Sequence, residues 1–189
     1  MYTRKIAVWA FALSLLGICI PKAHAQAQAH YGFGAPVSLQ ELSLYFSYPA
    51  DGAGLPPGSG IAAQGARVFA ENCAICHGEK LEGNPAVGIG GDKLLGGRGT
   101  LATKTPVKTV ESYWPYTTTL FDYIKRAMPF SSPGSLSDDQ VYSVVAYILS
   151  EAKIINPTDV MNGMTLPKVQ MPNREGFEPD PRPEVELYR

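Results

Sequence analysis

Apolar residues recur at helical spacing in three stretches of the chain, at 61–73, 118–127 and 137–152. The positions that mark the first stretch are Ala62, Ala66, Phe69 and Ala70. Those that mark the last stretch are Val141, Val144, Val145, Ile148 and Leu149. The pattern predicts three amphipathic helices, and therefore an all-α fold.

The residues at the helix ends agree with these limits. Ser137 is a suitable N-cap for the third helix, and Asp138 and Asp139 follow in its first turn, where negative charge is favourable to the helix dipole. Pro129 stops the second helix. Gly65 interrupts the first helix at a cost of about 1 kcal/mol relative to alanine. A glycine is useful there if another helix crosses closely, and we expect such a crossing.

Glycine and proline are abundant in the rest of the chain, with 19 and 16 residues. The stretch 78–110 is predicted to be mostly loop. Residues 26–60 form an N-terminal arm that ends in a Gly/Pro-rich linker, and residues 156–189 form a proline-rich C-terminal arm. We therefore expect one helical domain over 61–155, flanked by two extended arms.

Residues 1–25 have the pattern of a secretory signal peptide. Arg4 and Lys5 precede an almost unbroken apolar run over 6–20, and Ala23-His24-Ala25 supplies a cleavage site. The run is short of the roughly 20 residues that a membrane span needs. We expect cleavage near Ala25, a periplasmic location and no stable membrane span.

Composition narrows the range of functions. The full chain has a formal net charge of −1, and removal of the signal peptide makes it more acidic because three basic residues and no acidic ones leave. No basic patch in the sequence indicates a nucleic-acid partner. Of the three cysteines in the chain, Cys19 leaves with the signal, so the mature protein retains Cys73 and Cys76.

Cys73-Ala74-Ile75-Cys76-His77 is the attachment signature of haem c. Two thiols at this spacing can add across the two vinyl groups of one haem, and the following histidine then lies beneath the iron. A redox C-x-x-C pair is usually found in a βαβ context, and a structural zinc site needs four ligands. A disulfide would not need His77. The motif therefore predicts one covalent haem c, with His77 as the proximal iron ligand.

Met128 is the candidate for the second axial ligand. It follows the second helix and precedes Pro129, and histidine–methionine ligation is typical of cytochromes c. Met128 could instead fill the core. The rival ligands are Met161, Met164, Met171 and His30. An iron with both axial positions filled has no open site for a small ligand, which indicates an electron carrier with no catalytic residue of its own.

The order of helices and motif resembles a class I cytochrome c. In that family an N-terminal and a C-terminal helix cross closely, and Gly65, Phe69 and Tyr147 stand where the crossing residues are expected. A closer resemblance is to the cytochrome subunit of the periplasmic sulfite (sulfane) dehydrogenase of bacterial sulfur oxidation. The segments that carry it are Gly54–Gly60, Gly97–Leu101, Tyr113–Tyr116, Thr118–Ile124, Arg126–Phe130, Leu166–Val169 and Met171–Arg174.

This resemblance implies two partners. The family pairs its cytochrome with a molybdenum-cofactor subunit that oxidises sulfite or sulfane sulfur, and the electrons then pass to a downstream cytochrome. Some members carry two haem domains, whereas this chain has one C-x-x-C-H motif. The fold implied is the class I cytochrome c fold with a loop-rich haem pocket.

Three further residues have a functional and a structural interpretation. Trp114 and Tyr116 could lie beside a haem propionate or at a docking surface, or they could pack in a loop that shields the haem edge. Arg98 could pair with a propionate or lie exposed in its loop.

Two other functions stay open. The chain could be a free-standing carrier for another dehydrogenase or a terminal oxidase. It could also be a haem enzyme or sensor with an open distal site, which Met128 argues against. The apolar clusters of the two arms either fold back on the haem domain or contact a catalytic subunit.

Overall fold

The structure is a computed structural model, and it describes residues 38, 45, 47–88, 90–178 and 180–182. The predicted signal peptide, its cleavage site and His30 lie outside these residues, as does most of the apolar stretch of the N-terminal arm. Residues 40–189 belong to a single unit of the chain. None of the helices in the described ranges is long and apolar enough to cross a membrane.

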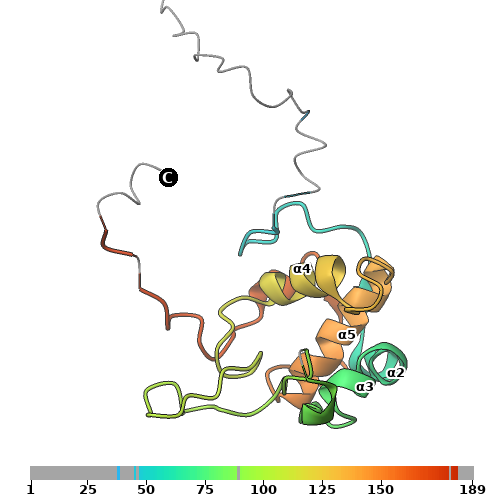
Figure 1. The fold of residues 1–189 in the computed structure, drawn as a ribbon. Coiled ribbons are helices and arrows are strands. Elements are labelled where there is room, and N and C mark those ends of the chain that lie inside the picture. The colour runs from blue at the N-terminus through green and yellow to red at the C-terminus, as the bar shows by residue number, and fades with distance from the viewer. Residues whose placement is uncertain (1–37, 39–44, 46, 89, 179, 183–189) are drawn as a thin grey trace, which may run out of the picture. The chain divides into compact units, whose positions relative to one another are not determined.

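Within the described residues four α-helices carry the fold (Figure 1): α2 (Ala62–Asn72), α3 (Ala74–His77), α4 (Thr117–Ala127) and α5 (Asp138–Glu151). Two short 3-10 helices, η1 (Pro85–Val87) and η2 (Leu166–Lys168), lie in the loops. Two strands of two residues each, β1 (Ser59–Gly60) and β2 (Met161–Asn162), pair antiparallel. The three predicted helices are confirmed to within one or two residues, and the fold is the helical fold of class I cytochromes c.

Helices α2 and α5 cross closely, as the position of Gly65 predicts. A Cβ atom at Gly65 would collide with the carbonyl oxygen of Ser143 on α5, so only glycine leaves room for the two backbones. Beside this contact the rings of Phe69 and Tyr147 pack with their centroids 5.3 Å apart. The expected crossing and its aromatic pair are therefore both present.

Helix α5 begins at the predicted cap. The Ser137 side chain accepts a hydrogen bond from the backbone N–H of Gln140, and the Gln140 side chain accepts one from the backbone N–H of Ser137. Lys125, near the end of α4, forms an ion pair of 2.7 Å with Asp138 in the first turn of α5. This pair links the two helices where the loop between them closes.

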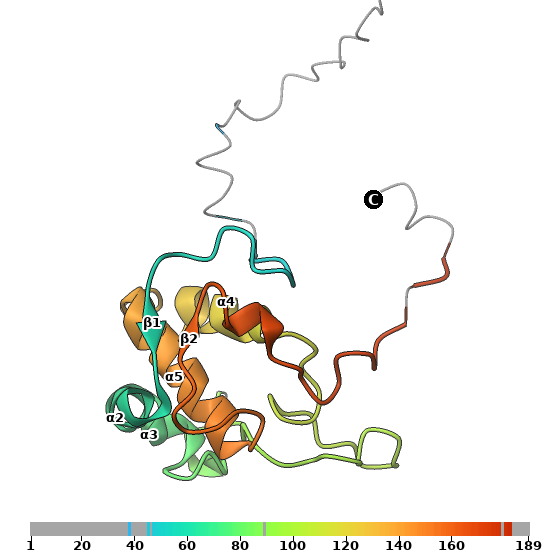
Figure 2. The ribbon, with the colours of Figure 1, turned by 180° about the vertical axis from the view of Figure 1, so that it is seen from behind.

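The C-terminal segment folds back on the helices, and β2 lies beside β1 (Figure 2). Met161, Leu166 and Met171 are all buried in the same hydrophobic core as α4 and α5. The Thr117 hydroxyl donates to the carbonyl of Leu166 at 2.6 Å. Part of the N-terminal linker is tied in as well, because the Tyr142 hydroxyl donates to the carbonyl of Pro56 at 2.9 Å. For the described parts of both arms, these contacts favour the interpretation in which they pack on the helical domain.

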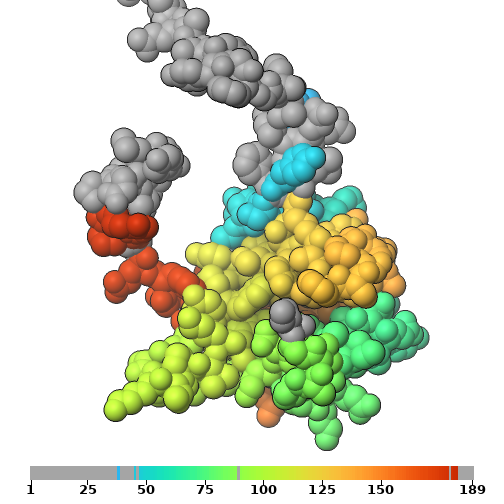
Figure 3. Space-filling view, in the orientation of Figure 1, coloured from blue at the N-terminus to red at the C-terminus, as the bar shows by residue number. Residues whose placement is uncertain are grey.

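On the face shown in Figure 3, helix α4, in yellow, and the green segment around residues 75–95 lie next to each other. The buried side chains between the elements come mainly from α4 and α5. The largest of them are Phe69, Phe121, Leu81, Tyr142 and Leu149. A cavity also opens between α4, α5 and the α2–α3 segment, and this cavity is the candidate site.

Gly65→Ala tests the crossing of α2 and α5. Alanine is normally favoured over glycine within a helix by about 1 kcal/mol. Here the added methyl group would force the helices apart, and overpacking of this kind lowers the free energy of unfolding by about 1–3 kcal/mol. Guanidinium denaturation followed by haem absorbance measures the difference. Arg67→Ala, an exposed change on the same helix, is the control, and a Gly65→Ala protein as stable as the control would contradict the close contact.

Candidate functional site

The cavity has an almost entirely apolar wall and encloses about 850 Å³ of space that protein atoms do not fill, part of it open to solvent. Helices α2, α3, α4 and α5 and the loops at 87–94, 110–114 and 128–130 all contribute to it. Its lining consists of Phe69, Asn72, Cys73, Cys76, His77, Val87, Gly90, Leu94, Val110, Trp114, Leu120, Tyr123, Ile124, Met128, Pro129, Phe130, Val144 and Ile148.

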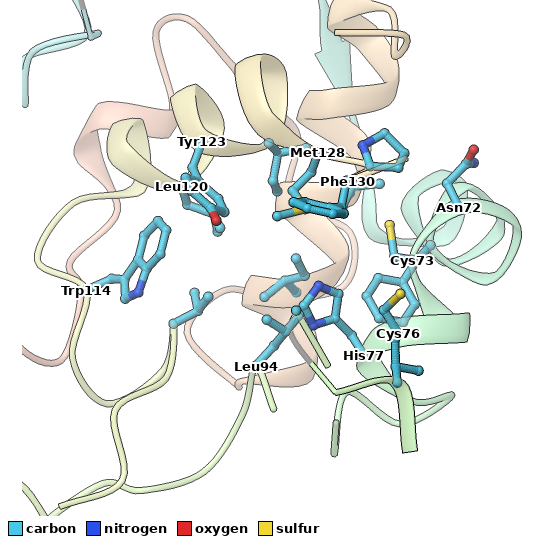
Figure 4. Close-up of a pocket in the computed structure, with 18 residues that line it drawn as sticks. Asn72, Cys73, Cys76, His77, Leu94, Trp114, Leu120, Tyr123, Met128 and Phe130 are labelled. Atoms are coloured by element: carbon cyan, nitrogen blue, oxygen red, sulfur yellow. The ribbon is translucent and has the colours of Figure 1, made fainter. Parts of the chain in front are cut away.

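Helix α3 brings the C-x-x-C-H motif to one wall of this cavity (Figure 4). It is a single turn, closed by hydrogen bonds from the backbone N–H groups of Cys76 and His77 to the carbonyl of Cys73, at 3.1 and 2.9 Å. Both cysteines are half-buried and neither forms a disulfide. Burial, with a smaller contribution from the neighbouring Cys76, raises the pKa of the Cys73 thiol to about 11. That sulfur therefore stays protonated at neutral pH.

The ring of His77 is held by the main chain of a loop. Its Nδ1 atom lies 2.7 Å from the carbonyl oxygen of Asp92. A carbonyl oxygen can only accept, so Nδ1 carries the proton and Nε2 keeps its lone pair for a metal ion. This contact with Asp92 orients the imidazole. It could not be predicted from the sequence, because any residue at position 92 offers the same carbonyl.

The loop 78–95 that supplies this carbonyl is closed by further hydrogen bonds. Asn84 Nδ2 donates to the carbonyl of Ile75 at 2.9 Å, and the Asn84 backbone N–H donates to the carbonyl of Gly91 at 2.8 Å. The Gly83 N–H donates to the carbonyl of His77 at 2.7 Å, with Gly83 at φ 85°, where glycine is favoured. The predicted loop is thus an ordered part of the site. Asn84 helps to position it, a role that its place in the sequence did not indicate.

Met128 directly follows helix α4 and lines the cavity. In Figure 4, Met128 and His77 project into the cavity from opposite sides. The other methionines in the described part of the chain do not line it: Met161 and Met171 are buried in the core, and Met164 is 73% exposed. Among these methionines the geometry therefore favours Met128 as the second axial ligand.

Trp114, Tyr116 and Arg98, each of which could lie at a haem edge or serve only the packing of its loop, lie in different places. Trp114 lines the cavity, where its ring packs edge-on against Tyr123 with centroids 5.7 Å apart. Tyr116 does not line it. Arg98 forms an ion pair of 2.6 Å with Glu111 and donates at 2.5 Å to the carbonyl of Ala152. Arg98 is therefore engaged by the protein itself.

These residues fit a covalent haem. The two free thiols and the imidazole share one wall, a thioether faces them, and the apolar lining suits the faces of a porphyrin. The described residues hold no cluster of three or more histidine, cysteine or carboxylate side chains that could bind a metal ion by themselves. The cavity thus offers two thiol sulfurs that could attach a haem, and one nitrogen and one thioether sulfur that could bind its iron.

The sequence matches known families over the same region. The pattern of the family "Cytochrome C oxidase, cbb3-type, subunit III" matches residues 60–148. The chain is 34% identical over 95 residues to cytochrome c6 of Synechococcus elongatus, covering 48% of this chain and 90% of that protein. It is 30% identical over 102 residues to a thiosulfate dehydrogenase of Stutzerimonas stutzeri, covering 54% of this chain.

The similarities differ in how much of each related protein they cover. The chain spans about a third of that thiosulfate dehydrogenase, 31%, and 24% of the FixP subunit of a Bradyrhizobium cbb3-type oxidase, to which it is 38% identical over 69 residues. Among solved structures it is similar to the sulfane dehydrogenase SoxCD from Paracoccus pantotrophus, with a TM-score of 0.71 and 39% identity. That similarity covers 84% of this chain and 77% of the SoxCD chain.

Met128→Ala tests the second axial position. Loss of the thioether should abolish the weak far-red charge-transfer band of ferric His/Met haem. It should also lower the reduction potential, by on the order of 100 mV within the roughly 0.8 V range that axial ligands span. Visible spectroscopy and a redox titration measure both. Met164→Ala, an exposed methionine outside the cavity, is the matched control. An unchanged band in Met128→Ala would assign the ligand to another residue.

Proposed function

Because the chain belongs to the cytochrome c family, we propose that it is the electron-accepting subunit of a sulfur-compound dehydrogenase. In this proposal it takes electrons one at a time from a periplasmic, molybdenum-dependent sulfite or sulfane dehydrogenase subunit. It then passes them to a downstream cytochrome. Electron transport by a covalently attached haem c follows from the family. The site residues, the partners and the compartment are the steps that we add.

The four residues predicted from the sequence would hold one haem. Cys73 and Cys76 would form the two thioethers, His77 would bind the iron on one side, and Met128 would bind it on the other. The observation that carries this assignment is that all four line one apolar cavity. When bound, the haem supplies a centre that changes its oxidation state by one electron.

The protein around the cavity suits electron transfer without proton transfer. The lining is apolar apart from Asn72, the indole N–H of Trp114, Tyr123 and the four residues proposed to hold the haem. The imidazole of His77 is fixed through its Nδ1 contact with Asp92, so it has no free proton to exchange at the iron side. An apolar wall also keeps water away, which favours the less charged ferrous state and raises the reduction potential.

The identity of the electron donor rests on the extent of one similarity. The match to SoxCD covers 84% of this chain, far more than the 60–148 region that the family pattern covers. The similarity therefore includes sequence in the arms as well as the haem domain. The match to a thiosulfate dehydrogenase is a second link to sulfur compounds. A free-standing carrier remains the second candidate, because the chain aligns with 90% of a cytochrome c6.

The assignment of the compartment rests on residues 1–25. Their charged start, apolar run and Ala23-His24-Ala25 site are the features of an export signal. Covalent attachment of haem through two free thiols is compatible with export. We therefore propose a periplasmic protein that begins near Gln26.

Covalent attachment is the first test. Acid-acetone extraction of the denatured protein should leave the haem on the polypeptide, with one iron per chain by elemental analysis. The double variant Cys73→Ala/Cys76→Ala should remove both thioethers and leave any bound haem extractable. His77→Ala should prevent assembly of the holoprotein, because so small a domain depends on the haem to fill its core. Fully extractable haem in the unmodified protein would contradict the attachment.

The partner is tested on the native protein. A tagged chain purified from its own cells should bring with it a second subunit that contains molybdenum, and the complex should reduce the haem when sulfite or a sulfane donor is added. A cytochrome that purifies alone, with iron and no molybdenum, would favour the free-standing carrier. Deletion of residues 156–189 would not test whether this arm binds the partner. Met161, Leu166 and Met171 belong to the core, so the deletion would destabilise the cytochrome itself.

A further inference from the structure

Trp114 is the aromatic residue by which the loop 109–116 reaches the cavity, which Val110 of the same loop also lines. It is half-buried, it lines the site, and its ring lies against Tyr123 with centroids 5.7 Å apart (Figure 4). Tyr123 is itself 47% exposed. The two rings therefore stand between the cavity and solvent, and the position of the indole affects how much water reaches the site.

The C-terminal segment 171–178, here called the clasp, holds the loop next to Trp114 at three points. Asn173 Nδ2 donates to the carbonyl of Tyr113 at 2.7 Å. The Phe177 ring packs edge-on against the Tyr113 ring at 5.2 Å between centroids. The Arg174 guanidinium lies 5.3 Å over the ring of Tyr116. The contacts thus fall on both neighbouring sides of Trp114, and Figure 3 shows the red clasp adjoining the yellow-green loop.

The clasp is anchored in the core at its first residue and is shaped by hydrogen bonds of its own. Met171 is 3% exposed and belongs to the core. The Arg174 N–H donates to the Met171 carbonyl at 3.1 Å, and the Gly176 N–H donates to the Asn173 carbonyl at 3.1 Å. A Cβ atom at Gly176 would collide with the Asn173 side-chain amide. The amide therefore lies in a fitted position, which a larger residue at 176 would disturb.

The loop is also held from its other side. The Tyr113 N–H donates to the Thr109 carbonyl at 3.0 Å. The Ser112 hydroxyl donates to the carbonyl of Val107 at 2.7 Å, and the Ser112 N–H donates to the hydroxyl of Thr109 at 3.2 Å. Tyr113, the residue before Trp114, is thus held at its carbonyl by Asn173 of the clasp and at its N–H by Thr109 of the loop itself.

We propose that Asn173 is a positioning residue for Trp114, through which the clasp sets the reduction potential of the haem. By holding the Tyr113 carbonyl it keeps the indole at the cavity and keeps water out. The ferric centre carries one more positive charge than the ferrous one, so admitted water stabilises it and lowers the potential. The inference rests on the proposed function in that a haem must occupy the cavity.

Trp114 reports on its own position, since it is the sole tryptophan of residues 26–189 and a haem close by quenches its emission. In the purified holoprotein without residues 1–25, which contain Trp9, Asn173→Ala should increase that emission, increase its quenching by acrylamide and shift the potential downward. Asn173→Gln keeps an amide donor and should restore part of each value. Gly176→Ala displaces the amide without removing it, so it should shift all three readings in the same direction as Asn173→Ala.

Gln170→Ala is the matched control, because the Gln170 amide donates at 3.3 Å within its own segment, to the carbonyl of Lys168. Circular dichroism at the working temperature selects the variants that are folded. The proposal is overturned if Asn173→Ala and Gly176→Ala leave emission, quenching and potential at the control values, or if the control shifts them equally. Failure of the haem assignment looks different: Trp114 emission would then be unquenched in the unmodified protein.

Discussion

The contact of Gly65 with the backbone of Ser143 sets the geometry on which the site depends. It lets α2 lie directly against α5, and a single residue, Cys73, then separates α2 from α3. The cysteines and His77 are thereby placed at a fixed distance from Val144 and Ile148, which line the cavity from α5. A side chain at position 65 would push α2 away from α5, and the attachment motif would then move away from Val144 and Ile148.

Helix α4 completes the cavity by a separate set of contacts. It packs on α5, and its last turn is joined to the first turn of α5 by the Lys125–Asp138 ion pair. Surface ion pairs stabilise a fold by about 0–1 kcal/mol, so this one serves to fix the turn more than to hold the helices together. The buried side chains Leu120, Phe121 and Ile124 supply the packing. Met128, one residue beyond the helix, follows their position into the cavity.

Features of this chain that depend on nearby residues could be predicted from the sequence. The three helices, the Ser137 cap and the covalent motif all depend on residues within a turn or two of each other, and Gly65 was informative because a glycine inside a helix is unfavourable without a reason. The contact between His77 and Asp92, and that between Asn173 and Tyr113, each use a main-chain carbonyl, which any residue supplies. Contacts of that kind do not depend on which residue supplies the carbonyl, so they cannot be predicted from the sequence and are seen only in the structure.

The C-terminal segment shows that an apolar cluster in an arm can pack in the core of its own domain and still leave residues exposed for a partner. Met161, Leu166 and Met171 alternate with exposed residues, and the buried set joins the core while Met164 stays 73% exposed. A segment anchored in this way can carry both structure and contact with a partner, because its backbone is ordered before any partner binds and docking then loses less entropy. The same anchoring places Asn173 against the loop of Trp114. Any partner that binds the outer side of residues 171–178 would therefore press on a segment that is one hydrogen bond away from the wall of the haem cavity.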